Sequence, residues 1–545
     1  MTTAPYPPRR CYGNSSAAAP TTSTELGTVS TIYTPPEWLN IADFFLDRRI
    51  EEGRGSRVAL RLEDKTLTFS EVQELANRFG QVLRGLGLRR EERLLVALPD
   101  GPEFVAAFFG ALKIGAVVVM VNPQLKPDRL AALFDYTQAG MAVLAGESVE
   151  AFEKAAKKAA WRPGFLVVGA REHGYAAFED EQHVYDGDLE TVRTHRDDPA
   201  IWLFSGGTTG TPKAVVQTHR SFFNTTERYA KTAIGYREDD VTLAIPKLFF
   251  GYATGSNLLF PFAVGASSVL FPEHPTAEIV FEKIRRFQPS ILINVPTMVN
   301  KMVHHPSASE QDLSCLRLAT SAGEALPIPL YEQWKDRFGV ELLDGLGTAE
   351  MWHVFISNLP GAVKPGTLGR PVPGFDVRVC DDEGREVPTG EVGRLWVRGG
   401  SRAICYWRKL EKTEEAFRGE WFVGGDLVSQ DEDGYITYCG RSDDVLKVGG
   451  KWLAPQEVES CLMRHEAVEE CAVVGIESAE GLMKPIAFVL TSHPSADLED
   501  ELKQFVLEHL EAYKHPRRVV VLESFPRTHL GKIDRGKLKA LADEP

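Results

Sequence analysis

Between residues 94 and 344 short apolar runs alternate with helical patterns, and no other feature constrains the fold as strongly. The runs have the length of strands and lie at 94–98, 116–121, 141–145, 165–168, 241–245, 267–271, 291–295, 316–321 and 340–344. Helical patterns separate many of them, at 103–113, 127–138, 276–287, 296–304 and 328–338. Strands that alternate with helices in this way pair in parallel sheets covered on both faces. The sequence therefore predicts an α/β fold with two parallel α/β sheet subdomains.

The rest of the chain predicts three further parts. With 545 residues the chain is too long for one core and should form several domains. Residues 1–35 are rich in Pro, Ser, Thr and Ala, and we expect a disordered tail there. From about residue 369 short alternating strands with Gly/Asp turns predict an antiparallel, β-barrel-like subdomain. We place a large N-terminal domain at 36–440 and a small α+β C-terminal domain at 441–545.

Composition disfavours several classes of protein. The formal charge of −15, from 76 acidic and 61 basic residues, argues against a nucleic-acid binder. The apolar run at 104–121 is interrupted by Lys113, Gly110 and Gly115, which favours a buried helix and strand over a membrane span. Seven cysteines without a CxxC pair indicate reduced thiols, no disulfide framework or zinc site, and a cytoplasmic protein.

The segment LFSGGTTGTPK, residues 203–213, is the clearest chemical signal. Residues 205–213 combine three glycines with four hydroxyl side chains and Lys213, directly after an apolar strand at 200–204. Glycine lets backbone N–H groups approach a phosphate closely, and the hydroxyls and the lysine add donors and charge. A Walker A loop needs Gly-Lys-Ser/Thr at its end, and here Gly210 is followed by Thr211-Pro212-Lys213. The segment predicts a phosphate-binding loop of another kind.

Four weaker motifs follow in the chain. DGLGTAE at 344–350 is a glycine-rich strand end with a hydroxyl and a carboxylate. WFVGGD at 421–426 places an acid after a glycine pair, and two basic glycine-containing segments lie at 440–451 and 526–532. Each is common by itself, and either a plain turn or a solvated loop explains it about as well.

Together and in order, these motifs resemble the adenylate-forming superfamily of acyl-CoA synthetases, carrier-protein adenylation domains and luciferases. The resemblance covers about residues 36–540 and rests on SGGTTGTPK, SAGEALP (321–327), GLGTAE (345–350), GEVGRLWVRG (390–399), GGDL (424–427), GRSDDVLKVGG (440–450) and PRTHLGK (526–532). Within that superfamily, KLFFGYATG (247–255) and GTAEMWHVFISN (347–358) look most like benzoate-CoA ligases and related aryl-CoA ligases.

The resemblance implies a two-step reaction that uses ATP, Mg²⁺ and coenzyme A. A carboxylate attacks the α-phosphate of ATP to give an acyl-adenylate and pyrophosphate, and the CoA thiol then expels AMP. It further implies that Lys532, Thr348 and Glu350 are catalytic, with Glu350 as the metal ligand and Lys532 bridging the carboxylate and the α-phosphate. ATP and AMP contacts carried over by motif are Ser205, Gly206, Gly207, Thr208, Thr209, Gly210, Lys213, Glu324, Asp344, Gly345, Thr348, Asp426 and Arg441.

The same resemblance implies an aryl-acid pocket and a mobile C-terminal domain. The pocket residues would be Phe250, Gly251, Tyr252, Ala322, Gly323, Gly347 and His353. Asp443 matches the hinge of a domain that swings between the two steps, and the CoA-binding residues would be Val448, Gly449, Gly450, Arg517 and Arg518. Benzoate-CoA ligases carry alanine where this chain has Gly251, so we expect extra room near the ring and tolerance of a small substituent.

The leading interpretation is an ATP-dependent aryl-CoA ligase for benzoate or a small substituted benzoate such as 2-aminobenzoate (anthranilate). An aryl-adenylating enzyme that loads the thiol of an acyl carrier protein stays open as the alternative. A non-catalytic nucleotide sensor is disfavoured, because Lys532 and Glu350 are both present. The partners expected are therefore a small aromatic acid, ATP and CoA, with a homodimer as an open option and no nucleic acid or membrane.

Overall fold

A computed structural model describes residues 34–171, 174–205, 213–442, 444–448, 451–477, 483–491, 493–527 and 533–542. Among these residues an eight-stranded sheet contains the strands predicted at 94–98, 116–121, 141–145 and 165–168. Its order is β19 (Cys405–Tyr406), β9 (Lys213–Thr218), β8 (Pro199–Ser205), β4 (Val117–Met120), β3 (Arg93–Ala97), β5 (Met141–Ala145), β6 (Gly164–Val168) and β7 (Ala176–Ala177). From β8 to β7 in this order all neighbouring strands are parallel, whereas β9 pairs antiparallel with both β8 and β19.

A nine-stranded sheet forms the second α/β layer. Its order is β16 (Arg370–Pro371), β15 (Val354–Ser357), β14 (Leu342–Gly347), β13 (Leu318–Ala322), β12 (Ile291–Asn294), β10 (Val241–Ala244), β11 (Ser267–Val269), β1 (Val58–Arg61) and β2 (Thr66–Thr68). The strands from β14 to β1 are parallel, and β2, β15 and β16 are antiparallel edges. The predicted pair of parallel sheets is confirmed, with antiparallel strands added at the edges.

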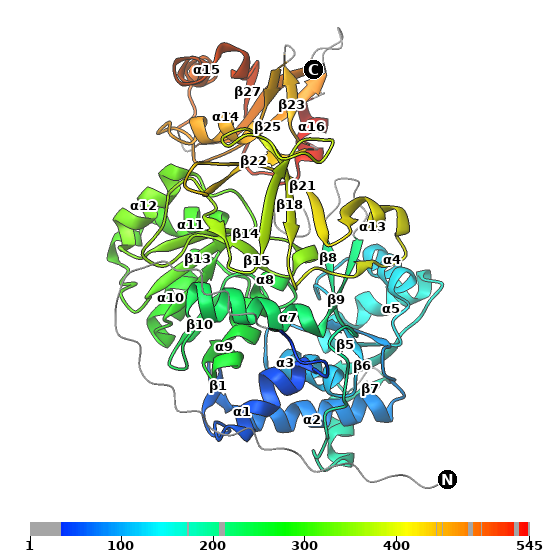
Figure 1. The fold of residues 1–545 in the computed structure, drawn as a ribbon. Coiled ribbons are helices and arrows are strands. Elements are labelled where there is room, and N and C mark those ends of the chain that lie inside the picture. The colour runs from blue at the N-terminus through cyan, green and yellow to red at the C-terminus, as the bar shows by residue number, and fades with distance from the viewer. Residues whose placement is uncertain are drawn as a thin grey trace. The chain divides into compact units, whose positions relative to one another are not determined.

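Helices cover both sheets, as Figure 1 shows for α2, α3, α4, α5 and α10 to α12. The longer ones are α2 (Phe69–Gly85), α3 (Pro102–Lys113), α4 (Pro127–Thr137), α5 (Val149–Lys158), α10 (Ala277–Phe287), α11 (Pro296–Val303) and α12 (Ile328–Phe338). Shorter segments are α1 (Arg48–Glu51), α6 (Phe178–Glu181), α7 (His219–Thr225), α8 (Gly251–Thr254), α9 (Phe260–Val264) and α13 (Leu410–Ala416). The π-helical segments η1 (Asp43–Asp47), η4 (Thr226–Ile234) and η5 (Gly255–Leu259) continue into or from α1, α7 and α8. Among the described residues no helix is long and apolar enough to cross a membrane.

The predicted barrel-like subdomain is instead an open antiparallel sheet. It pairs β17 (Asp376–Cys380), β18 (Gly393–Arg398), β21 (Trp421–Gln430) and β20 (Phe417–Arg418), and β22 (Ile436–Arg441) also pairs with β21. Among the described strands the sheet does not close into a barrel, because β17 at one end pairs with neither β20 nor β22 at the other. Strand β19, which lies between β18 and β21 in the chain, joins the eight-stranded sheet instead. The sequence pattern showed antiparallel strands correctly but contained no signal for closure.

The C-terminal residues form an α+β unit, as predicted. It comprises β23 (Leu446–Val448), β24 (Lys451–Leu453), α14 (Pro455–Leu462), β25 (Glu470–Glu477), β26 (Met483–Leu490), α15 (Leu498–His509), β27 (Arg518–Val521) and α16 (Arg535–Ala542). Buried residues from these elements, among them Leu453, Val473 and Leu502, make a hydrophobic cluster of their own. This unit therefore has its own core.

Helices α2 and α3 pack closely because two glycines face each other. A Cβ on Gly110 would lie 2.6 Å from the carbonyl oxygen of Ala76, and one on Gly80 would lie 2.9 Å from the carbonyl oxygen of Gly110. The sequence Ser70-Glu71-Val72-Gln73 predicts a capping box at 70–73, and the start of α2 differs from that prediction. The side chain of Thr68 caps the helix, and Glu71 returns the hydrogen bond to the Thr68 N–H. The motif is therefore present two residues earlier.

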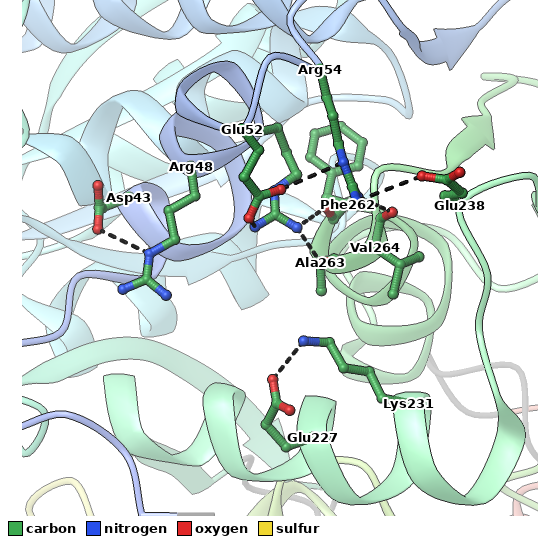
Figure 2. A network of polar contacts seen from close by, with 11 residues as sticks. Asp43, Arg48, Glu52, Arg54, Glu227, Lys231, Glu238, Phe262, Ala263 and Val264 are labelled. Carbon is green, nitrogen blue, oxygen red and sulfur yellow. Dashed lines mark hydrogen bonds and ion pairs between the residues drawn. The ribbon is translucent and has the colours of Figure 1, made fainter. Parts of the chain in front are cut away.

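The end of α9 is held by two arginines. Arg54 Nη1 donates to the carbonyl oxygen of Val264 at 2.6 Å, and Figure 2 shows this side chain lying over the helix end between Glu52 and Glu238. The buried Arg49 donates to the carbonyl oxygens of Phe262 and Ala263. Cations at a helix C-terminus satisfy carbonyls that have no partner within the helix. The network fixes the end of the helical segment 251–264, which also carries Tyr252.

Candidate active site

The two ends of the phosphate-loop segment face each other across a β-hairpin. Ser205 ends β8, Lys213 begins β9, and the two residues are paired in the antiparallel register. Gly206, Gly207, Thr208, Thr209 and Gly210 lie outside the described residues. The ammonium nitrogen of Lys213 lies 4.8 Å from the centre of the Tyr406 ring. The loop is therefore strand-fed, as predicted, and its lysine lies against an aromatic face.

The turn that follows β14 presents Thr348 and Glu350 to a large cavity. Thr348 Oγ1 accepts a hydrogen bond from the N–H of Met351, so its own hydroxyl hydrogen is left to donate. Glu350 is buried, and its Oε1 accepts a 2.8 Å hydrogen bond from the Tyr406 hydroxyl. Both residues line the cavity, together with Gly345, Gly347 and Tyr252. The sequence did not single out Tyr406, which lies 56 residues beyond Glu350.

Asp344 is a buried residue whose contact with ATP stays a prediction. Its side chain is buried and is absent from the cavity lining, whereas Gly345 is part of that lining. Burial raises the pKa of Asp344 well above its usual range. Gly345 and Glu324 remain on the cavity wall, and Glu324 accepts hydrogen bonds from the N–H and hydroxyl of Thr297.

Asp426 and Arg441 lie opposite each other on neighbouring strands. They are paired in the register of β21 and β22, and Arg441 Nη1 lies 3.1 Å from Asp426 Oδ1. Both residues line the cavity. A carboxylate positioned by a cationic neighbour can accept hydrogen bonds from vicinal hydroxyls. The sequence motifs assigned both residues to ATP but did not predict a contact between them, which the pairing of β21 with β22 provides.

Aromatic and small residues form one wall of the cavity. Phe250, Gly251, Tyr252, Ala322, Gly323, Gly347 and His353 all line it. The hydroxyl of Tyr252 lies 2.7 Å from Thr320 Oγ1, which fixes the orientation of the ring. His353 packs against the rings of Tyr252, Tyr229 and Phe260, with ring centres 5.3, 5.3 and 4.7 Å away. All seven residues predicted for the aryl pocket are therefore gathered on one cavity.

The contacts of His353 determine its tautomer. Nε2 lies 3.0 Å from the carbonyl oxygen of Tyr252, which can only accept, and 2.9 Å from the hydroxyl of Ser256. Nε2 therefore carries the proton. Burial lowers the pKa of His353 to about 3, so the ring is neutral near pH 7. Nδ1 is then a bare acceptor, and it has no hydrogen-bond partner among the described residues.

Gly251 leaves less room than the sequence suggested. A Cβ at this position would lie 3.3 Å from Leu203 Cδ2 and 3.4 Å from Trp352 Cζ3. These separations are shorter than an ordinary carbon–carbon contact, so the space is slightly smaller than a methyl group. The expectation of extra room from the absent methyl is corrected. Any tolerance of a ring substituent must come from elsewhere in the pocket.

An ionisable pair, the buried Asp100 and the half-buried Lys247, supports the aromatic wall and was not recognised in the sequence. Asp100, which follows β3, accepts a 2.8 Å hydrogen bond from the N–H of Leu248. Lys247 donates to the carbonyl oxygen of Phe271 at 2.7 Å. Burial raises the pKa of Asp100 to about 6 and lowers that of Lys247 to about 8. The pair ties the start of the segment that carries Phe250 and Tyr252 to both sheets.

Replacing Asp100 by asparagine should change the pH dependence of stability. The pKa of Asp100 is about 6 in the folded state and 3.8 as the ordinary value of an aspartate. The free energy of unfolding is therefore highest below pH 3.8 and falls by about 3 kcal/mol as the pH rises through 6. Asparagine keeps an acceptor for Leu248 but does not ionise. Urea unfolding should show the wild type losing stability relative to Asp100→Asn between pH 4 and pH 7. The exposed change Asp336→Asn is the control, and parallel curves for wild type and Asp100→Asn would contradict the assignment.

Several predicted C-terminal residues cannot be placed. Lys532, Asp443, Gly449 and Gly450 lie outside the described residues, and their roles stay predictions. Val448 is buried in the C-terminal core. Arg517 is exposed, whereas Arg518 is half-buried and donates to the carbonyl oxygen of Ala542 at 3.0 Å. Of the predicted arginine pair, Arg517 is thus the better placed to meet a phosphate from solvent.

Two family models match most of the chain. A model described as AMP-binding enzyme matches residues 46–407, and its C-terminal domain model matches residues 457–532. The chain belongs to this AMP-binding enzyme family. A benzoate–CoA ligase from Thauera aromatica is 40% identical over 514 residues, which is 93% of this chain and 96% of the relative.

Two solved structures are similar over nearly the whole chain. The anthranilate CoA ligase AuaEII in complex with anthranoyl-AMP has 39% identity and a TM-score of 0.90, covering 93% of this chain and 98% of that one. A benzoate CoA ligase from Burkholderia xenovorans LB400 has 38% identity and a TM-score of 0.85, covering 92% and 100%. The protein is an AMP-forming ligase of the aromatic acid–CoA ligase family, whose co-substrates are ATP and CoA.

Proposed function

We propose that this ligase activates benzoate or a benzoate with a small hydrogen-bond donor on the ring, such as 2-aminobenzoate, and transfers it to CoA. The observation that carries the proposal is His353 Nδ1, a buried acceptor on the aryl wall without a partner among the described residues. Leaving a buried acceptor unmet costs about 1–3 kcal/mol. If the His353 ring turns so that Nδ1 faces the cavity, an amino or hydroxyl group on the substrate ring would relieve that cost, whereas unsubstituted benzoate would not.

Two further observations agree with an aromatic acid of this size. Tyr252 and Phe250 give the pocket flat apolar walls, which favour a ring and leave little space for a long acyl chain. Similar proteins include a benzoate–CoA ligase and the anthranilate CoA ligase AuaEII. The family resemblance therefore favours benzoates, and His353 favours those with a donor.

The chain's own residues suggest how the adenylate would form. The loop that begins at Ser205 and ends at Lys213 would hold the β- and γ-phosphates, and Thr348 would donate to the α-phosphate. Asp426 and Arg441 would hold the ribose hydroxyls. Glu350 fits Mg²⁺, which in nucleotide sites is bound by one or two carboxylates together with substrate phosphates. The metal would neutralise charge on the phosphates, and Lys532 would place a compact positive charge on the transferring group.

The second step would need the C-terminal domain to rotate. Lys532 cannot remain at the adenylate while a thiol enters, so we propose Asp443 as the hinge. Val448, Gly449 and Gly450 would then line the path of the pantetheine arm, and Arg517 would meet the CoA phosphates. The alternative acceptor is the thiol of a carrier protein. Release of AMP and formation of the aryl thioester with CoA alone would support CoA, and adenylate accumulation without thioester would favour the carrier.

Substrate profiling tests the proposed acid. We expect kcat/KM for 2-aminobenzoate to equal or exceed that for benzoate, and a value below about one-hundredth of it would contradict the proposal. In His353→Phe the kcat/KM for 2-aminobenzoate divided by that for benzoate should fall about tenfold, because one hydrogen bond to the substituent is lost. The ratio is an internal control, since a loss of folded enzyme lowers both values equally. An unchanged ratio would remove His353 from the recognition of the substituent.

A further inference from the structure

A short strand outside the recognised motifs lies against the base of the phosphate loop. In β19, Tyr406 pairs with Val215 and Cys405 pairs with Val216 of the antiparallel β9. The N–H of Trp407 also donates to the carbonyl oxygen of Ala214 at 2.9 Å, one residue after Lys213. Strand β19 is thus the edge strand beside the point where the loop re-enters the sheet.

The turn that carries Glu350 is tied to the same two segments. Gln217 of β9 donates through Nε2 to the carbonyl oxygen of Ala349 at 2.6 Å. The N–H of Ala403 donates to the carbonyl oxygen of Glu350 at 2.8 Å. These contacts fix the backbone of the turn relative to β9 and β19, but they do not orient the carboxylate itself.

Tyr406 is the residue that reaches both functional side chains. Its hydroxyl donates to Glu350 Oε1 at 2.8 Å, and its ring faces the ammonium group of Lys213 at 4.8 Å. A carboxylate oxygen can only accept, so the phenol is the donor in this contact. No ion pair joins Lys213 to Glu350 in the part of the chain that the structure describes.

We propose that Tyr406 is a positioning residue for adenylate formation: it aligns the Glu350 carboxylate for a divalent cation and keeps Lys213 turned toward the phosphates. A hydrogen bond from outside the coordination sphere fixes the orientation of a ligating carboxylate. With Oε1 held by Tyr406, Oε2 would be left to bind the cation. The ring gives Lys213 a cation–π contact in place of an ion pair with Glu350, so both charges stay available to MgATP. The inference rests on the proposed metal role of Glu350.

The direct test is Tyr406→Phe, which keeps the ring and removes the hydroxyl. Mn²⁺ binding in the presence of a non-hydrolysable ATP analogue, followed by EPR, should weaken about tenfold, because a hydrogen bond to a charged group is lost. Adenylate formation should slow by a similar factor, and thioester formation from supplied aryl-adenylate should be unchanged. Tyr435, directly before β22, is absent from the cavity lining. Tyr435→Phe therefore makes the same chemical change away from the site and should alter neither Mn²⁺ binding nor adenylate formation.

A double-mutant cycle with Glu350→Gln separates positioning from a general loss of structure. If Tyr406 acts through Glu350, its removal should have little further effect on Mn²⁺ binding in the Glu350→Gln background. Additive effects of the two changes, or Mn²⁺ binding by Tyr406→Phe equal to that of wild type, would overturn the proposal. Wild-type affinity in Glu350→Gln alone would overturn the metal role and the positioning role together, while leaving the choice of aromatic acid untouched.

Discussion

Replacing Lys532 by alanine is expected to slow adenylate formation by on the order of 10²-fold or more, the scale seen when one preorganised charge-stabilising group is removed from a site. Charge accumulates on the transferring α-phosphoryl group, and a lysine ammonium is a compact cation that can approach it. Lys532 lies outside the described residues, so its role comes from its motif PRTHLGK, at 526–532.

The two half-reactions distinguish this role from a loss of folding. Pyrophosphate exchange measures adenylate formation, and aryl-CoA production from supplied adenylate measures the second step. In Lys532→Ala the first should fall and the second should largely survive. Equal losses in both would mean that Lys532 supports the C-terminal domain as a whole. Lys484→Ala, at an exposed position of β26 in the same domain and absent from the cavity lining, is the control and should leave both steps near wild type.

Replacing Gly347 by alanine should be the most damaging change in the aryl pocket. A Cβ at this position would meet the carbonyl oxygen of His353, and would lie 2.6 Å from its carbonyl carbon and 2.9 Å from the nitrogen of Val354. These are backbone atoms of β15 and the residue before it, so no side chain can move aside. The strands β14 and β15 must separate, which costs about 1–3 kcal/mol for a forced shift in a packed core.

That shift would also move the aryl wall. His353 would be displaced from Tyr252 and Ser256, and a misplacement near 1 Å at a reacting site can cost about 10²-fold in rate. We expect kcat/KM for the aromatic acid to fall by that order in Gly347→Ala, with a lower melting temperature. Gly164→Ala is the matched control, because a Cβ there meets its nearest atoms at 3.7 Å. Wild-type kinetics in Gly347→Ala would contradict the described geometry.

Local patterns predicted the strands and helices well, because each buried strand is a short apolar run and each helix repeats its apolar face. The errors arise where distant residues decide the outcome. Closure of the antiparallel sheet depends on which strand pairs with β21. The capping box differs by two residues because Thr68, and not Ser70, caps α2. The room beside Gly251 depends on Leu203 and Trp352, which no local pattern relates to it.

The candidate site shows the same division. Motifs identified Glu350, Asp426 and His353, because their chemistry is specific in combination. Tyr406 escaped notice, since an aromatic residue in CYWRK carries no chemical signal until β19 places it beside β9. Asp344 was assigned to ATP because it begins the motif DGLGTAE, and the structure shows that its side chain is buried and absent from the cavity lining.

The central claim is that this chain joins aromatic acids to CoA at the expense of ATP. The most direct measurement supplies purified protein with ATP, Mg²⁺, CoA and an equimolar mixture of benzoate, 2-aminobenzoate and hexanoate, and identifies the thioesters by mass spectrometry. The account predicts aryl-CoA products, with AMP formed in equal amount and 2-aminobenzoyl-CoA at least as abundant as benzoyl-CoA. Hexanoyl-CoA as the main product, or ADP in place of AMP, would contradict it.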